Sequence, residues 1–474
     1  MLSDDILYLS VWELGARIAA RWISPIELTE AYLERLERIG PKLGAVATVT
    51  RELAMEQARA AEQEIAAGHS RGPLHGIPYG AKDLLATRGI PTAWGAPPFK
   101  KQVFDYDATV IRKLREAGAV LVAKLAMIEL AGGGGYNSAS ASLQGATRNP
   151  FNTGYWAGGS SSGPAAAVAA GLVGFAIGSE TLGSIVTPAA FCAVSGLRTT
   201  YGRVSRHGAM PLSWTMDKLG PMCRTAVDCG LVLNAIAGED SLDAASRREP
   251  LYWWPPNDEK RARSLAGKRL GVLRPDFKTA GNADVGANFD AALEVLRKIG
   301  ARVEETSLPE FPYAAVAETI YSAEMASVFR PFVESGQVDG LLDDSQKAGL
   351  VAAQSLRATD YLDACRLRTE IQSEMANLFE KYDALAAPSR TSTAPAVDRD
   401  FEAAPETPDR ANLIAGSNIA GLPAISVPCG FTREKNLPIG IQFVCDALRE
   451  DACIECAHAY QLATDWHTRR PKLQ

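Results

Sequence analysis

The sequence predicts an α/β protein, and three observations indicate this class. Helical patterns, in which apolar residues recur every three or four positions, alternate along the chain with short apolar runs. Such runs are typical of buried strands. The composition, with 47% hydrophobic and 22% charged residues among 474, is ordinary for a globular protein that buries a large core. Length alone would predict two or three domains.

The N-terminal part of the chain, residues 11–67, is largely helical by its periodicity. Ser24 followed by Pro25 is typical of a helix start. We find no pattern of catalytic residues in this tract. Four apolar residues mark one helix face: Leu28, Tyr32, Leu36 and Ile39.

The segment 72–83 predicts a strand that runs into the interior, because small and apolar residues precede Lys82. Desolvation disfavours the charged form of a buried lysine, and a neutral amine can act as a general base. Lys82 is therefore a candidate base, although an isolated lysine beside an acidic neighbour is more often a surface residue. Beyond it, residues 108–117 predict a helix and residues 119–123 a strand.

The stretch 156–202 carries two loops that contain serines. The first is the Gly/Ser turn 158–163, which leads into a helix with Pro164 in its first turn. The apolar run 172–177 then predicts a buried strand.

The second loop, residues 178–184, feeds another short helix for which Thr187 is the candidate cap and Pro188 the start. Unpaired N–H groups and the helix dipole favour negative charge at such helix ends. Gly183 permits a backbone conformation in which successive amides point at one oxygen, as a tetrahedral oxyanion requires. A Gly/Ser-rich turn between tightly packed elements is an equally plain explanation of this loop.

The rest of the chain alternates again between the two kinds of element. Residues 241–265 are polar and indicate a surface excursion. A strand is predicted at 268–273, and helices are predicted at 282–299, 313–335 and 359–382.

Charge and composition exclude several classes of function. A net charge of −6 argues against a nucleic-acid partner and supplies no basic patch for a membrane surface. The longest run of low polarity, residues 164–178, is too short to cross a bilayer, and the N-terminus shows no signal-peptide pattern. We therefore expect a cytoplasmic protein. Its eight scattered cysteines predict no disulfide framework, and the C-x-x-C at 453–456 lies in a helical pattern without a second pair.

The stretch 156–202 resembles the signature of the amidase signature family. That signature reads G-G-S-S-(G/S)-G, then D-x-G-G-S-I-R, then P-A and G-(L/F)-(K/R)-P-T-x-G-R. Ser184 follows Ser160 by 24 positions, which is the spacing between the two catalytic serines of the family. The matching segments here are Gly158–Gly163, Glu180–Val186, Pro188-Ala189 and Gly196–Arg203.

The resemblance covers nearly the whole chain and implies one large domain over residues 1–474, in which helices cover both faces of a twisted mixed sheet. Residues 241–380 match only loosely, so we expect them to form the variable region of the substrate pocket. Segment 72–83 resembles the family's G-I-P-x-x-x-K-D, with Lys82 at the lysine.

The implied function is hydrolysis of a carboxamide C–N bond through an acyl-enzyme, with release of ammonia or an amine. Ser184 would be the nucleophile, Ser160 the bridging serine in a cis peptide, and Lys82 the base, with Ser161 in support. The oxyanion hole would consist of backbone amides, those of Thr181, Leu182, Gly183 and Ser184. The glycine run implies weaker substrate contacts, at Ala131, Gly132 and Gly133.

Three of the departures from the family pattern bear on the site. Glu180 replaces an aspartate, Leu182 a glycine and Val186 an arginine. Leu182 must reach the backbone angles of the oxyanion loop despite its side chain, and the lost arginine removes a candidate anchor for acidic substrates.

Several alternatives stay open. The same residues suit carbamate, urea-type or ester bonds, a glutaminase-like amidotransferase component with a partner chain, or a non-catalytic scaffold. An α/β-hydrolase would use Ser161 at the centre of G-x-S-x-G, but that motif needs a preceding strand and residues 149–157 are rich in turn formers. We expect a small amide substrate and no metal or organic cofactor. A homodimer is also open.

Overall fold

The computed structural model describes residues 2–249, 251, 253–275, 277, 282–401 and 408–473. In this part of the chain, eleven strands form one mixed sheet, and two further strands form a small hairpin. The predicted architecture, one large mixed sheet in a single domain, is confirmed. From one edge to the other the main sheet runs β1 (Val46–Val49), β3 (Val120–Leu125), β2 (Pro78–Lys82), β6 (Phe175–Glu180), β8 (Lys218–Cys223), β7 (Ser195–Arg198), β12 (Ala424–Phe431), β13 (Pro438–Val444), β11 (Ala384–Pro388), β9 (Arg269–Leu273) and β10 (Arg302–Thr306).

The strands around β2 are parallel, because helices connect them. β2 pairs in parallel with both β3 and β6, and β9 pairs in parallel with β10 and β11. The central strands from β6 through β13 pair antiparallel. The small hairpin consists of β4 (Arg148–Asn149) and β5 (Asn152–Trp156).

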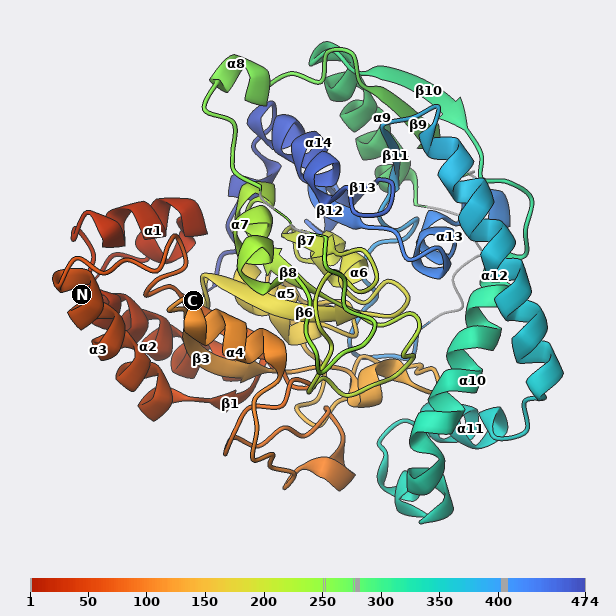
Figure 1. The fold of residues 1–474 in the computed structure, drawn as a ribbon, viewed down its shortest axis with the longest axis horizontal. Helices are drawn as coiled ribbons and strands as arrows, with labels where there is room; N and C mark the ends of the chain where they lie inside the picture. The colour runs from red at the N-terminus through yellow and green to blue at the C-terminus, as the bar shows by residue number, and fades with distance from the viewer. Residues whose placement is uncertain are drawn as a thin grey trace.

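Fourteen α-helices surround the sheet in the described ranges. Figure 1 shows α1 to α3 as a lobe on one side of the molecule and α10 to α12 along the opposite side, with α5 and α6 near the centre. Their bounds are α1 (Val11–Ala19), α2 (Pro25–Leu43), α3 (Arg51–Ala66), α4 (Thr109–Glu116), α5 (Ser162–Ala169), α6 (Val186–Phe191), α7 (Ala226–Ile236), α8 (Glu259–Ala262), α9 (Ala283–Lys298), α10 (Tyr313–Glu334), α11 (Asp344–Ala353), α12 (Ala358–Phe379), α13 (Leu413–Ile419) and α14 (Glu450–Leu462).

The sheet is covered on both faces, as the alternation of strand side chains shows. In β6, Phe175 and Ile177 belong to one buried cluster and Ala176, which points to the other face, to a second. Helices α1, α4, α7, α9 and α14 pack into the first cluster and α2, α3 and α5 into the second. A third cluster joins α10, α12 and α13 beside the far half of the sheet.

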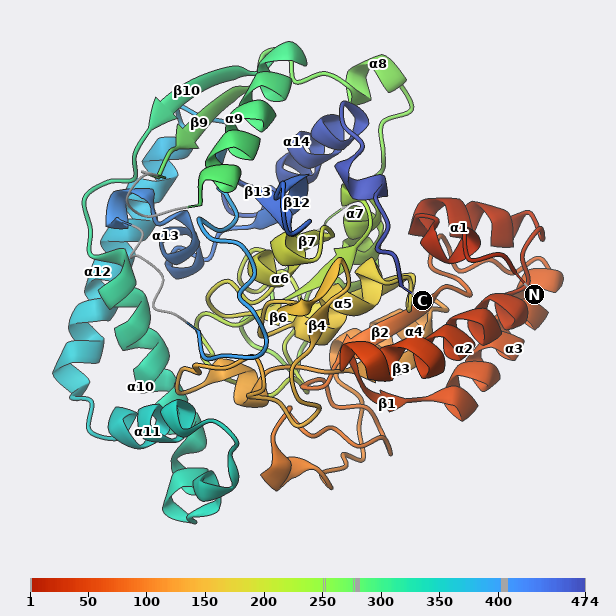
Figure 2. The same cartoon turned by 180° about the vertical axis from the view of Figure 1, so that it is seen from behind.

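The two ends of the chain meet at the N-terminal lobe. Figures 1 and 2 agree in placing the C-terminal mark at the N-terminal lobe, close to α2. An ion pair between Arg470 and Asp5 links the two ends there, and Leu473 packs against the cluster that contains α2. The last strands of the sheet are thus followed by a segment that returns to its first helices.

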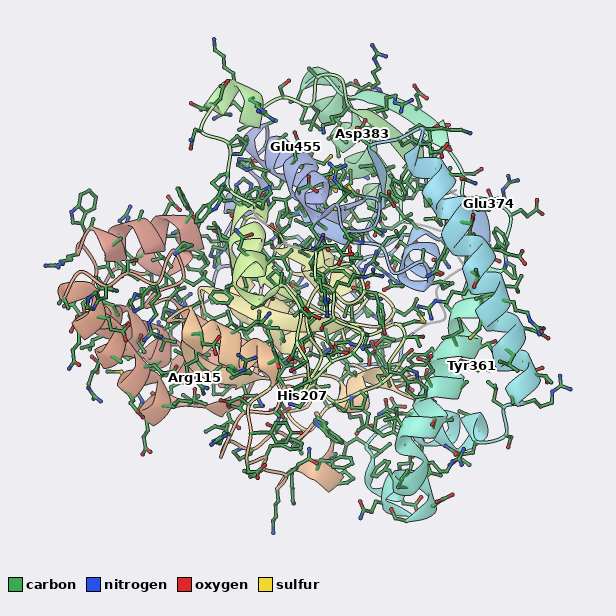
Figure 3. All side chains as sticks on the ribbon, in the orientation of Figure 1. Arg115, His207, Tyr361, Glu374, Asp383 and Glu455 are labelled. Carbon is green, nitrogen blue, oxygen red and sulfur yellow. The ribbon has the colours of Figure 1, made fainter. Side chains whose placement is uncertain are left out.

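The outer surfaces of the helices are polar. Figure 3 shows charged side chains over the whole outline, such as Arg115 on α4 and Glu374 on α12, and both are exposed. In the described ranges, no helix has the length and apolar character needed to cross a bilayer.

Most predicted elements are present, with three corrections of position. The strand predicted at 172–177 is β6, which begins only at Phe175, because Leu172 and Val173 are buried in the turn that ends α5. Burial without sheet pairing gives the same apolar pattern as a strand. β6 also continues to Glu180, so the first three residues of the predicted loop 178–184 belong to the strand. The helical tract 11–67 also contains the short strand β1, which the helical periodicity of its neighbours concealed.

Candidate active site

Lys82 is the last residue of β2 and has no solvent exposure. Since β2 lies between β3 and β6, its carboxyl end opens at the middle of the parallel part of the sheet. The Nζ atom of Lys82 lies 2.7 Å from Ser160 Oγ, 3.0 Å from Ser161 Oγ and 2.9 Å from Ser179 Oγ. Three hydroxyl groups therefore surround the amine, and no carboxylate of the described chain bonds to it.

Burial lowers the pKa of Lys82 to about 7, although the carboxylates of Asp217 and Glu180 act in the opposite direction. A large fraction of the amine is therefore neutral near pH 7. A neutral amine carries a lone pair, so it can accept a proton from one of the three hydroxyls while it donates to the others. The sequence-based expectation of a buried lysine at this position is confirmed.

Ser160 and Ser161 lie in the loop between β5 and α5. The peptide bond between Gly159 and Ser160 is cis, and Ser160 is buried with its Oγ on Lys82. Ser161 is fully buried, and its Oγ donates to the carbonyl of Ser179 and accepts from the amide of Ser179. The hydroxyl of Ser161 is thus fully engaged in joining this loop to β6.

The strand that the α/β-hydrolase alternative requires is partly present. The prediction that residues 149–157 hold no strand is wrong, because β5 (Asn152–Trp156) is one. Its turn-forming residues belong to an edge hairpin, and β5 pairs with β4 outside the main sheet. Together with the engaged hydroxyl of Ser161, this geometry does not resemble a nucleophile elbow.

Ser184 lies in the loop between β6 and α6 and is partly exposed. Within the described chain, its Oγ makes no hydrogen bond, so the structure brings Lys82 and Ser160 together without closing a contact from Ser160 to Ser184. The backbone N–H groups of Leu182, Gly183 and Ser184 likewise donate to no described residue. Three unpaired amides thus flank an accessible hydroxyl.

The departure at Leu182 has a simple structural solution. Only Gly183 takes a positive φ, of 96°, in this loop, whereas Leu182 has an ordinary backbone conformation and is 38% exposed. The leucine side chain points away from the core and does not oppose the turn.

The carboxylate of Glu180 fixes the loop that carries Ser184. Its Oε2 accepts from the amides of Ile185 and Val186, at 2.8 and 2.9 Å, and its Oε1 accepts from Arg198 and Asn418. Burial alone would raise the pKa of Glu180, but the Arg198 guanidinium and the amide donors outweigh burial and hold that pKa below its ordinary value. The carboxylate therefore fixes the turn that carries Ser184.

The predicted cap of the second helix is wrong. α6 begins at Val186 with Ile185 at the N-cap position, and Thr187 lies inside the helix without a capping bond. Because Glu180 reaches the first amides of α6 from the preceding strand, a side chain distant from the helix replaces a local cap.

Ser184 opens onto a cavity of about 1230 Å³. Ala131 and Gly132 line it, as expected for substrate contacts, but Gly133 does not. The carbonyl of Gly132 accepts a hydrogen bond of 2.5 Å from the hydroxyl of Tyr321 on α10. Helices α10 and α11 form much of one wall through Glu318, Tyr321, Ser322, Met325, Gly349, Ala352 and Ala353.

Two residues of the site were not among the predicted site residues. Ser179 belongs to the predicted loop 178–184 but lies in β6, and only the position of β6 beside β2 brings it to Lys82. Arg390 lies just after β11 and lines the cavity, far from every motif in the chain. No group of three or more His, Cys, Asp or Glu side chains in the described ranges is placed to hold a metal ion.

The chain matches known sequences along nearly its full length. A family model described as Amidase matches residues 27–454. A relative from Methylococcus capsulatus, which is named as a component of glutamyl-tRNA(Gln) amidotransferase, is 37% identical, with 97% of this chain and 98% of the relative covered.

Solved structures with the same fold support this match. The native peptide amidase of Stenotrophomonas maltophilia superposes with a TM-score of 0.84 at 32% identity, with 98% of each chain covered. A bacterial aryl acylamidase, described as a member of the amidase signature enzymes, superposes with a TM-score of 0.84 at 25% identity and 97% coverage of each chain. The resemblance seen in the sequence is confirmed: the chain belongs to the amidase family and is an amide-hydrolysing enzyme.

Proposed function

We propose that the protein cleaves a carboxamide C–N bond through an acyl-enzyme on Ser184, with Ser160 and Lys82 as its proton relay. The observation that carries this proposal is the enclosed amine of Lys82, which lies 2.7 Å from Ser160 Oγ beside the free amides of the Ser184 loop. A serine hydroxyl is a weak nucleophile until a base takes its proton.

The reaction begins when Lys82 accepts the hydroxyl proton of Ser160 and Ser160 accepts that of Ser184. Ser184 Oγ then attacks the amide carbon, and the C=O electron pair moves onto the oxygen. When the C–N bond breaks, the proton returns from Lys82 through Ser160 to the leaving nitrogen. Water then hydrolyses the acyl-enzyme by the same relay and releases the carboxylic acid.

The developing oxyanion accepts hydrogen bonds from the backbone amides at positions 181–184. Fixed donors that point at the charge formed in the transition state stabilise it without reorganisation. The unpaired amides of Leu182, Gly183 and Ser184 support this role, as does the hold of Glu180 on the following turn. The side chain of Thr181 also fixes the start of this loop, because its Oγ1 donates to Asp217 at 2.6 Å.

The substrate region forms the remaining part of this proposal. Residues 241–380 form the wall of the cavity that determines which amide is accepted. The residues of α10 and α11 that line the cavity support this role. Ala131 and Gly132 contact the substrate near the scissile bond. The other interpretations of the same residues, as a carbamate, urea or ester hydrolase or as an amidotransferase component, are not favoured.

We also propose that the enzyme works in the cytoplasm, and a homodimer stays an open prediction. All eight cysteines are free thiols and seven are buried, which is the state that a reducing compartment maintains. Light scattering of the purified protein distinguishes a dimer from a monomer, and fractionation of cells tests the compartment.

Covalent labelling tests the nucleophile. A fluorophosphonate should label Ser184 in the folded enzyme, and Ser184→Ala should abolish both labelling and hydrolysis of a primary amide panel. Ser161→Ala is the matched control and should keep the label. Peptide mapping that places the adduct on Ser161 would overturn the mechanism in favour of the α/β-hydrolase interpretation.

A further inference from the structure

Arg390 lines the same cavity as Ser184 and has no partner among the described residues. It lies two residues beyond the end of β11, and its side chain is half-buried. Its Nε is enclosed, yet it finds no acceptor, and neither a hydrogen bond nor an ion pair joins the guanidinium to any described residue. An arginine whose Nε is enclosed without an acceptor is unusual, because buried polar groups in proteins are nearly always hydrogen-bonded.

No charged group among the described residues compensates the charge of Arg390. Burial lowers the pKa of Arg390, and only the hydroxyl of Tyr136 counteracts this effect. No carboxylate of the described chain lies close enough to compensate the charge. Within the described ranges, no side chain therefore neutralises this partly enclosed cation.

The other cations of the cavity differ in this respect. Arg399 lies 3.9 Å from Asp398 and has a further partner. Lys435 is exposed, with its Nζ 5.5 Å from the centre of the Tyr155 ring. Arg399 therefore has partners within the protein, and the ammonium group of Lys435 is open to solvent. Arg390 differs from both, because its Nε is enclosed without a described acceptor.

A second unpaired donor lies on the same wall. The indole Nε1 of Trp156 is enclosed and has no acceptor, and Trp156 also lines the cavity. Its ring packs against Phe401 at 4.8 Å and against Tyr136 at 5.9 Å. Two enclosed donors without a described acceptor thus belong to residues that line this cavity, and a ligand group that accepts hydrogen bonds would match them.

We infer that Arg390 binds a carboxylate at the end of the substrate remote from the scissile bond, so that the preferred substrates are amides of acidic compounds. This inference rests on the proposed hydrolysis at Ser184. Arginine presents a planar fork of donors that matches a carboxylate, and such charge-assisted pairs are the strong ones. The position usually held by an arginine after the nucleophile is Val186 here, so the anion anchor comes from a different element.

The test compares pairs of substrates. A series of primary amides with a terminal carboxylate and increasing chain length is assayed beside the matched amides in which a methyl ketone replaces the carboxylate. For the best chain length, kcat/KM should favour the acidic member by about 10- to 100-fold, the range expected for a hydrogen-bonded charge pair.

Arg390→Gln should remove most of this preference, and Arg390→Lys, which keeps the charge but loses the fork, should retain an intermediate part. Lys435→Gln is the matched control, because it removes the same charge from an exposed position of the same cavity. Its ratio should stay within about threefold of the wild-type ratio, as expected for a solvent-screened charge. Thermal melting checks that each variant is folded.

The outcomes separate this inference from the proposed function. Hydrolysis of neutral amides without a preference for acidic ones, or a preference that survives Arg390→Gln, would overturn the role of Arg390 and leave the amidase mechanism intact. Failure to hydrolyse any member of either series would overturn the proposed function itself.

Discussion

Two buried lysines occupy neighbouring strands of the sheet and have different surroundings. Lys82 ends β2, and Lys124 lies on β3 opposite Ala81, one position away from Lys82 in the register. Neither has solvent exposure. Lys124 Nζ lies 3.2 Å from Asp83 Oδ1 and 2.7 Å from Thr92 Oγ1, whereas Lys82 Nζ meets three serine hydroxyls.

This difference shows that partners, and not burial, distinguish Lys124 from Lys82, the base that we propose. Burial lowers the pKa of both amines. At Lys124 a carboxylate in direct contact counteracts burial and holds the pair together. At Lys82 the contacts are neutral hydroxyls that can transfer a proton. An amine that has lost its own proton can accept one from them.

The largest expected effect comes from removing the amine at β2. Lys82→Ala should lower kcat by about 10³- to 10⁴-fold, the range for loss of a general base that also activates the nucleophile. Its melting temperature should change little, because the lost amine was desolvated. Steady-state hydrolysis of a primary amide and thermal melting measure both quantities, and a variant that keeps the wild-type rate would remove Lys82 from the mechanism.

The second effect concerns stability. Lys124→Met leaves the carboxylate of Asp83 buried without its cation, which should lower the free energy of unfolding by about 3–5 kcal/mol. Adding Asp83→Asn should recover part of this loss, because no charge then stays buried. Denaturant unfolding measures the difference between the two variants. If Lys124→Met instead abolished activity in a fully stable protein, the division between the two lysines would be wrong.

A smaller effect concerns the serine hydroxyls that surround Lys82. The hydroxyl of Ser179 accepts from the ammonium form of Lys82, so Ser179→Ala should lower the pKa of Lys82 further. The acid limb of the rate profile should move to lower pH by less than about one unit, and the plateau rate should fall less than about tenfold. An alkaline shift of that limb would show that the hydroxyl stabilises the neutral amine instead.

The sequence predicted the fold class and a buried Lys82, because these follow from strand patterns and from motifs shared with the family. The catalytic roles of Lys82, Ser160 and Ser184 stay predictions. The sequence could not predict Ser179 or Arg390, since only the pairing of β6 with β2 and the end of β11 bring them to the site. The cap of α6 was wrong for a similar reason: Glu180 acts across a loop.

The pH dependence of kcat/KM for a neutral primary amide tests the central claim, that neutral Lys82 is the base. A base works in its unprotonated form, so the rate should rise about tenfold per pH unit in acid and level off above a midpoint near the Lys82 pKa of about 7. A rate that is constant from acid to neutral pH, or a midpoint near the ordinary lysine value of 10.5, would contradict it.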